Sequence, residues 1–568
     1  MLKKVKNFID KHWNLIFEII AILVIVLYAI SLSPKSLQND AFYTVSVGKL
    51  ISENGIDYKD HFSWHENLPY TYPHWLYDLM MFKIYDLGGW NAIYISTCVF
   101  ASILGICIYK VNSKLSKNKF ISFLVTLGSL FLLETYITAR AQLVTFILFI
   151  LLVYNIERVL QERKLINGIA LILIQLLIAN LHVAVWPFTF VLYLPYVGEY
   201  LICELTDFIL YHKARMHKLK QEQKQIEKDI AKEGEKEDLL YDREAVRKDI
   251  EELENRIERI KAARENNLKN PYKLKMEKNK NARWLILIMI IAIFTGLATP
   301  LKTTPFTYTY LTIKSGETKS INEHLPMTLV DNAKIICTLV IIMGIVGFTN
   351  IKIRLPDLFM LGGLTYLMLA SRRQSSMFAL IGTIAFVRIV TDMFLFYTKK
   401  DGKEILKNKL TKILTIIISV ILIVISVQGI IKKKDSGYIS KKSYPVDAAE
   451  WILNNLEVDK IRLYNEYNYG SYLLYKGIPV FIDSRADLYA PEFNSTTGEK
   501  IDGEEIFDDF MDVSTIARYY GEVFDKYDVT HIITKKDSKM NMIIQNTEPK
   551  KYKILYEDKY FILYANGE

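Results

Sequence analysis

Cysteine is scarce in this chain and follows no pattern. The four cysteines among 568 residues are Cys98, Cys107, Cys203 and Cys337, and each lies in an apolar run. No two of them have the spacing of a metal-ligand pair, and their number and placement exclude a disulfide framework. They are typical of small packing residues in a hydrophobic interior.

The chain also lacks the composition of an ordinary soluble enzyme. Hydrophobic residues make up 51% of it, too many for that class, while charged residues make up 23%, too many for membrane helices alone. The net charge of +9 requires no nucleic-acid partner, because lysines that flank membrane spans on the cytoplasmic side produce the same excess. We therefore expect a mainly α protein with a polytopic transmembrane helix bundle and soluble parts.

Eleven apolar runs are long enough to cross a bilayer, which takes roughly 17–25 residues. The first run has no small-residue cleavage site, so we expect a retained membrane anchor and not a signal peptide. A further run, 75–87, is interrupted by Asp78, Lys83 and Asp86, and we interpret it as an interfacial helix. The predicted spans are 14–33, 91–110, 119–138, 141–158, 166–182, 184–205, 284–301, 334–350, 355–371, 375–396 and 410–430.

Positive charge predicts the orientation of these spans. If the N-terminus is inside and 75–87 does not cross, the lysine-rich segments 110–119, 211–282 and 399–409 all face the cytoplasm. Residues 432–434, three lysines placed outside, are an exception to the rule. We expect a multi-pass protein of a bacterial cytoplasmic membrane, with its N-terminus inside and its C-terminus outside. The expected membrane region consists of a first half, 1–210, whose outer loop 34–90 carries interfacial helices, and a second half, 283–431.

The insert at 211–282 is densely charged, and its apolar residues have an alternating 4-3 spacing. Val246, Ile250, Leu253, Ile257 and Ile260 follow the seam pattern of a coiled coil. With a turn near 233–235, this pattern predicts a cytoplasmic coiled-coil hairpin. Two interpretations stay open, a solvated spacer or a docking platform for a partner or a second copy of the chain.

From about residue 441 the chain alternates helical and strand patterns. This predicts a soluble extracytoplasmic α/β domain at 441–568, of a size that can hold its own core. The stretch Asp483-Ser-Arg-Ala-Asp487 is either an ion-paired turn or a strand-end site that faces the membrane. The expected strands are 461–464, 480–483, 529–534, 552–557 and 560–564, and the expected helices are 446–456, one beginning near 470, 504–512 and 515–526.

Charged and imidazole side chains from five separate segments meet at the predicted outer face. Each has an ordinary explanation by itself, since an arginine at a span end is usually an anchor and a lone histidine usually packs. Together they suit a lipid-linked phosphate, because arginine binds phosphate bidentately and a carboxylate can act as a general base or help to hold a divalent cation. The predicted spans carry these charges at one membrane face and are apolar at their midplanes. This disfavours a transporter, whose polar residues commonly lie at the midplane. The residues are Asp40, Arg140, His182, Glu323, His324, Arg372 and Arg373.

The outer loop at 34–90 interleaves aromatic and polar residues, among them His61, His74 and Trp75. This composition suits stacking of a sugar, and a membrane interface belt would have it as well. We regard these three residues as candidates for substrate binding.

The layout resembles that of the GT-C superfamily of polytopic glycosyltransferases, which use polyprenyl-phosphate-linked sugars. The aspartate after the first span is Asp40. Ser320-Ile-Asn-Glu323 resembles the Thr-Ile-x-Glu motif of oligosaccharyltransferase catalytic subunits. Glu466-Tyr-Asn-Tyr-Gly470 stands in the place of their Trp-Trp-Asp-Tyr-Gly motif, but only its last two residues match. The resemblance implies that Asp40 and Glu323 are catalytic, or that they hold a Mg²⁺ or Mn²⁺ ion together with His324.

The sequence thus favours an enzyme that moves a sugar from a polyprenyl-phosphate or polyprenyl-diphosphate carrier to an extracytoplasmic acceptor. The acceptor could be a cell-wall polymer, a lipid or a protein, and inversion at the anomeric carbon is what the resemblance implies. An enzyme that transfers a whole lipid-linked glycan would use the same phosphate site. The alternative from another class is a non-catalytic membrane scaffold or a transporter of envelope assembly, organised by the coiled coil.

Overall fold

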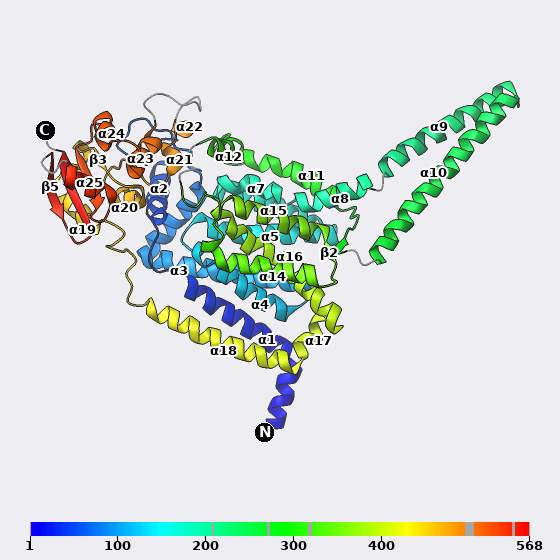
Figure 1. Ribbon diagram of the computed structural model, residues 1–568, viewed down its shortest axis with the longest axis horizontal. Coiled ribbons are helices and arrows are strands. Elements are labelled where there is room, and N and C mark those ends of the chain that lie inside the picture. The colour runs from blue at the N-terminus through cyan, green and yellow to red at the C-terminus, as the bar shows by residue number, and fades with distance from the viewer. Residues whose placement is uncertain are drawn as a thin grey trace.

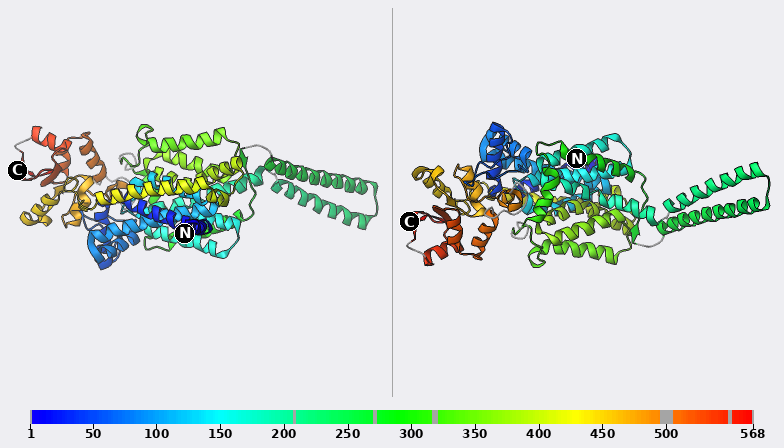
Figure 2. Two further views of the ribbon diagram at one scale, coloured as in Figure 1. Left: turned by 90° about the horizontal axis from the view of Figure 1, so that it is seen from below. Right: turned by 90° about the horizontal axis from the view of Figure 1, so that it is seen from above.

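The computed structural model describes residues 2–206, 209–269, 273–315, 321–494, 505–547 and 551–566. The chain is mainly helical, as expected. A bundle of helices forms the middle of the molecule, a long helical hairpin projects from one end, and a smaller part with a β-sheet lies at the opposite end (Figure 1). The two further views show the same order of the three parts (Figure 2).

Within the described residues, six helical segments are long and apolar enough to cross a membrane. Five shorter apolar helices lie where other spans were predicted, so the chain is a membrane protein by composition, while the number of spans and their orientation stay predictions. The long segments are Asp10–Leu32 of α1 (Leu2–Leu32), α3 (Trp75–Ser116), α5 (Ala141–Gln161), Val183–Leu205, Arg372–Thr398 and α18 (Lys409–Lys432). The shorter ones are α4 (Lys119–Leu132), α6 (Leu165–Leu181), Ala282–Leu297, α14 (Ala333–Phe348) and α15 (Leu355–Ala370).

Proline and glycine residues set the boundaries of two predicted helices. The segment 184–205 is divided into α7 (Trp186–Val191) and α8 (Leu194–Thr206), and each contains a proline near its start, where a missing N–H is tolerated. The expected helix at 75–87 is the first part of α3. A kink at Gly88 and Gly89, the latter with a φ of 60°, separates residues 75–87 from the rest of α3.

The helix α2 (Asp40–Asn54) packs closely against α3. Gly48 lies so near the backbone of Asp78 that an added Cβ would stand 2.0 Å from the carbonyl oxygen. Only glycine permits this approach, and it sets how α2, which begins with Asp40, lies on the bundle.

A long helical hairpin is formed by α9 (Ile209–Glu233) and α10 (Glu237–Lys269). Gly234, with a φ of +83°, lies in the turn between them, as the sequence predicted. Leu219, Val246 and Leu253 are buried between the two helices, and the latter two belong to the predicted apolar seam. The hairpin points away from the β-sheet, at the other end of the bundle (Figures 1 and 2).

The C-terminal part contains a four-stranded sheet of order β3-β4-β6-β5. Its strands are β3 (Leu463–Tyr464), β4 (His531–Lys535), β5 (Tyr552–Glu557) and β6 (Phe561–Asn566), of which only the β3–β4 pair is parallel. Its helices include α19 (Val446–Asn455), α20 (Tyr467–Tyr475), α23 (Ile506–Thr515), α24 (Tyr520–Lys526) and α25 (Lys539–Thr547). The sequence did not predict α25, and α20 begins before the expected position.

The predicted strand at 480–483 was wrong. The segment makes a single bridge, between Val480 and Ser63, and its neighbouring backbone groups bond to the Asn465 side chain. Phe481 N–H donates to Asn465 Oδ1 over 2.9 Å, and Asn465 Nδ2 donates to Ile482 O over 2.7 Å. The backbone groups of this buried run therefore bond to the Asn465 side chain and, at Val480, to the backbone of Phe62 and Trp64, and not to a strand of the sheet.

The C-terminal part shares one hydrophobic core with the outer loop at 34–90. Trp64 Nε1 donates to the carbonyl of Leu463 over 3.0 Å. Arg485 lies between Asp60 and Asp483, with each N–O distance at 2.7 Å, and all three side chains are about 1% exposed or less. The core thus crosses the predicted domain boundary at 441.

A second buried charge cluster was missed, and the expectation of charge at one face only was wrong. Arg388 Nη1 lies 2.9 Å from Glu157 and 2.8 Å from Asp357. Arg354 also pairs with Glu157, over 3.3 Å. Glu157 lies about four turns along α5 from its start. Pairing and hydrogen bonding make such charges tolerable inside an apolar bundle, where they join α5, α15 and α16 (Ser375–Thr398).

Candidate functional site

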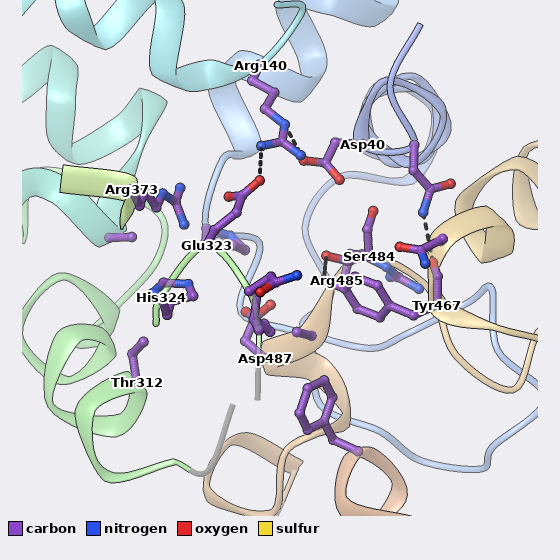
Figure 3. A pocket seen from close by; sticks show the side chains of 18 of the residues that line it. Asp40, Arg140, Thr312, Glu323, His324, Arg373, Tyr467, Ser484, Arg485 and Asp487 are labelled. Atoms are coloured by element: carbon purple, nitrogen blue, oxygen red, sulfur yellow. Dashed lines mark hydrogen bonds and ion pairs between the residues drawn. The ribbon is translucent and has the colours of Figure 1, made fainter. Parts of the chain in front are cut away.

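A cavity of about 1380 Å³ lies between the bundle and the C-terminal part. Side chains from both parts line it and face one another across it (Figure 3). Of the residues predicted from the sequence, Asp40, His74, Arg140, His182, Glu323, His324 and Arg373 lie on its wall.

Arg140 joins the two predicted catalytic carboxylates. Its Nε lies 2.7 Å from Asp40 Oδ2, and its Nη1 lies 3.2 Å from Glu323 Oε1 (Figure 3). Asp40 is the first residue of α2, where the helix dipole favours a carboxylate. Arg140 precedes α5 in an extended backbone conformation. Three segments far apart in the sequence therefore meet at one guanidinium.

The charges of this group are mutually stabilised. Asp40 above all, and then Glu323, raise the pKa of Arg140 although burial acts in the opposite direction. Burial alone would raise the pKa of Glu323, but Arg140 and Arg373 hold it below its ordinary value. We therefore expect Glu323 to be ionised at neutral pH, with the guanidinium charge of Arg140 largely neutralised.

Arg372 and Arg373 are neighbours with different surroundings. Arg372 donates to the carbonyl of Pro326 and to Asn322 Oδ1, both over 3.3 Å, and it is not among the lining residues. Arg373 lines the cavity, and within the described part of the chain no carboxylate lies within ion-pair distance of its guanidinium. Its backbone N–H donates to the carbonyl of Glu323, which ties the two segments together. Arg373 is therefore the arginine able to take an anionic ligand.

His74 and His182 are in ring contact, with centroids 4.7 Å apart. Burial, and then the charges of Arg373 and Arg140, lower the pKa of His74 to about 3, so this imidazole is neutral at physiological pH. A backbone bond from Val183 N–H to the Pro73 carbonyl, 3.0 Å, holds the two histidine-bearing segments side by side. The pair forms a neutral polar wall next to the arginines.

Two predicted binding residues lie away from the cavity. His61 is exposed and pairs with Asp57 over 2.6 Å. Trp75 donates from Nε1 to Asn180 Oδ1 over 3.3 Å and so supports the turn that precedes His182. Neither side chain is among those that line the cavity.

The C-terminal part contributes lining residues whose role the sequence pattern left open. Ser484, Arg485 and Asp487 all line the cavity, and Asp487 accepts a hydrogen bond from Tyr308 over 3.1 Å. Burial raises the pKa of Asp487. The stretch 483–487 is thus both an ion-paired turn and part of the cavity wall, and the alternation of Asp and Arg after an apolar run was the signal for it.

Glu466 and Tyr467 line the same side of the cavity. The carbonyl of Tyr467 accepts a hydrogen bond over 2.9 Å from Nδ2 of Asn39, the residue before Asp40 (Figure 3). Burial raises the pKa of Glu466. The motif-like stretch 466–470 therefore reaches the cavity, whereas Ser320 of the other motif-like stretch lies outside the described residues.

The described residues contain no group of three or more His, Cys, Asp or Glu side chains arranged to hold a metal ion. Asp40 and Glu323 are both directed at Arg140, so a divalent cation would compete with this guanidinium for their oxygen atoms. His324, the residue after Glu323, also lies on the cavity wall. The divalent cation stays a prediction.

No known family model matches this chain, and no curated protein matches it significantly.

Proposed function

We propose that the protein is a membrane glycosyltransferase that moves a sugar from a polyprenyl-phosphate-linked donor to an extracytoplasmic acceptor. The observation that carries this proposal is the unequal state of two arginines in one cavity. Arg140 is in ion-pair contact with two carboxylates, whereas Arg373 lines the cavity and has no carboxylate of the described residues within ion-pair distance. A phosphate is the ligand whose charge and geometry suit such a guanidinium.

The second support is the position of Asp40, which is ion-paired with Arg140 and lines the same cavity as Arg373. In the proposed reaction a bond forms between the acceptor oxygen and the anomeric carbon while the bond from that carbon to the phosphate oxygen breaks. The acceptor proton passes to the carboxylate of Asp40, and the electron pair leaves with the lipid phosphate, whose charge Arg373 stabilises. Arg140 holds Asp40 in place through the ion pair of 2.7 Å between its Nε and Asp40 Oδ2.

The topology that this function requires is part of the proposal. The C-terminal part, which supplies one wall of the cavity, and the hairpin lie at opposite ends of the bundle (Figure 1). With eleven spans and the N-terminus inside, the cavity faces the extracytoplasmic side, where lipid-linked sugars are presented. A Mg²⁺ or Mn²⁺ ion, if it binds at Asp40 and Glu323, would add positive charge next to the leaving phosphate.

The test is turnover of the purified full chain on a panel of polyprenyl-phosphate sugars, wild type against Asp40→Asn. We expect release of lipid phosphate by the wild type and a loss of about 10³-fold in the variant, since a general base contributes 10²–10⁴-fold. A hairpin variant, Leu253→Asp, is the matched control and should keep its activity. Equal turnover of wild type and Asp40→Asn would remove Asp40 from the mechanism. A panel without any turnover would favour the scaffold alternative.

A further inference from the structure

The hydrogen bonds around His182 determine which of its ring nitrogens carries the proton. Thr145 Oγ1 donates to the carbonyl of Ala141 over 2.6 Å, and it lies 3.1 Å from His182 Nδ1. A hydroxyl has one proton to donate, and here that proton is already used. The Thr145 oxygen can therefore only accept from the ring, so Nδ1 of His182 is the protonated nitrogen.

Nε2 of His182 is consequently an acceptor. The side chain is 2% exposed, and within the described residues Nε2 has no hydrogen-bond partner. A buried charge without a counter-ion is costly, which favours the neutral ring with a lone pair on Nε2. A buried acceptor left without a donor also costs free energy, so a ligand that supplies a donor gains from the pairing.

The surroundings indicate what kind of group this acceptor would meet. His182 belongs to the cavity wall, in ring contact with His74. Arg373 is close enough to lower the pKa of His74, so the proposed phosphate position is nearby. A phosphate oxygen is itself an acceptor and does not suit Nε2, whereas a sugar hydroxyl is a neutral donor that a phosphate-linked sugar brings to this place.

We propose that His182 Nε2 accepts a hydrogen bond from a hydroxyl of the sugar attached to the lipid phosphate. Thr145 is then a positioning residue, because it holds the ring in the tautomer that leaves Nε2 unprotonated. This inference rests on the proposed function and assigns His182 a part in selecting the sugar.

The first experiment measures the tautomer and requires no turnover. Histidine side chains are labelled with ¹⁵N, and the ring signals of His182 are assigned by their absence in His182→Asn. We expect a protonated Nδ1 and an unprotonated Nε2 in the wild type, and loss of this pattern in Thr145→Val. A protonated Nε2 in the wild type would overturn the inference.

The second experiment compares two substitutions of similar size. His182→Asn keeps a donor near Thr145 but has no group at the Nε2 position, whereas His182→Gln places an amide oxygen there. We expect kcat/KM to fall about 10- to 100-fold in His182→Asn and less than about tenfold in His182→Gln. Both variants must elute as folded protein in detergent and melt within a few degrees of the wild type.

Donors that lack one sugar hydroxyl test whether His182 binds the sugar or only packs against its neighbours. For the wild type, removal of one particular hydroxyl from the donor should lower kcat/KM by the same factor as the substitution His182→Asn. The His182→Asn variant should use this deoxy donor and its parent equally well. Equal losses in His182→Asn and His182→Gln, with every deoxy donor still distinguished, would overturn this inference alone. A wild type inactive on every donor would overturn the proposed function and this inference with it.

Discussion

At the scale of single residues, the charged side chains in and around the cavity differ in whether other residues already hold them. Two adjacent arginines of the sequence differ because the chain turns between them. Arg372 is bonded to the segment that carries Glu323, and Arg373 faces the cavity. Their chemistry is identical but their surroundings differ, so we expect Arg372 to hold the loop and Arg373 to bind an anion.

Replacement of each arginine by alanine tests this division. We expect Arg373→Ala to lower kcat on the order of 10²-fold, because it removes a donor that stabilises charge on the leaving phosphate. Arg372→Ala is the control and should lower kcat less than about tenfold, through a looser loop. The measurement is release of lipid phosphate under saturating donor. Loss of similar size in the two variants would contradict the assignment.

The buried group of Asp60, Arg485 and Asp483 predicts a dependence of stability on pH. Burial alone would raise the pKa of Asp60, but Arg485 and hydrogen bonds from Ser63 keep it below its ordinary value. A carboxyl whose pKa is lowered by folding stabilises the fold above its unfolded pKa of about 4. This stabilisation by Asp60 is lost as the pH falls from about 4 through the lower pKa that Asp60 has in the folded state.

We expect Asp60→Asn to lower the free energy of unfolding by about 3–5 kcal/mol at neutral pH, because it leaves Arg485 with one carboxylate fewer in a buried site. The melting temperature of the variant should depend less on pH between about 5 and 2 than that of the wild type. Tryptophan fluorescence during thermal unfolding in detergent measures both the melting temperature and the free energy of unfolding. Asp57→Asn, in the same loop but partly exposed, should cost less than about 1 kcal/mol.

At the scale of elements, the placement of α2 on α3 determines where Asp40 stands. The two helices touch through Gly48, which leaves no space for a side chain. The position of Asp40 and the contact of the neighbouring Asn39 with the C-terminal part follow from this packing. A change in the crossing of α2 and α3 should thus reach the cavity without touching any residue that lines it.

Gly48→Ala should lower the free energy of unfolding by about 1–3 kcal/mol, the usual cost of overpacking, and reduce turnover as well. The control is Gly128→Ala in α4, where an added Cβ would meet nothing within 4 Å. That substitution should leave stability the same or slightly higher, since alanine is the better helix former. Thermal unfolding and turnover of both variants provide the comparison, and a Gly48→Ala protein as stable and active as the wild type would refute it.

At the scale of the whole molecule, the hairpin and the C-terminal part lie at opposite ends of the bundle (Figures 1 and 2). If the bundle crosses a membrane, these two parts are on different sides of it. The positive charge around the spans predicts which side is which.

Cysteine labelling tests the predicted sides. In a background without the native cysteines, Tyr241→Cys marks the hairpin, where the side chain is 76% exposed, and Asp459→Cys marks the C-terminal part. With a membrane-impermeant maleimide on intact cells we expect labelling at 459 and none at 241. After permeabilisation both positions should react. Labelling of 241 alone in intact cells would reverse the topology and place the cavity on the cytoplasmic side.

The sequence by itself determined where most helices begin and end. Apolar runs and the 4-3 spacing of the insert are local patterns, and helices form from local hydrogen bonds and local burial. The spacing alone was thus enough to assign the apolar positions Val246 and Leu253 to a buried seam. The sequence also predicted that the turns carrying Asp40, Arg140, His182, Glu323 and Arg373 lie together, and all five residues line one cavity.

Only the tertiary structure decided which of these charges meet. The bond between Arg485 and Asp60 joins residues 425 positions apart, and no local pattern carries that information. The same holds for Arg140, which pairs with Asp40 and Glu323 instead of remaining free for phosphate. The physical reason is that an ion pair depends on the packing of distant elements, whereas helix formation depends on neighbours in the chain. The partners of each charge are therefore set last, by the packing of the whole molecule.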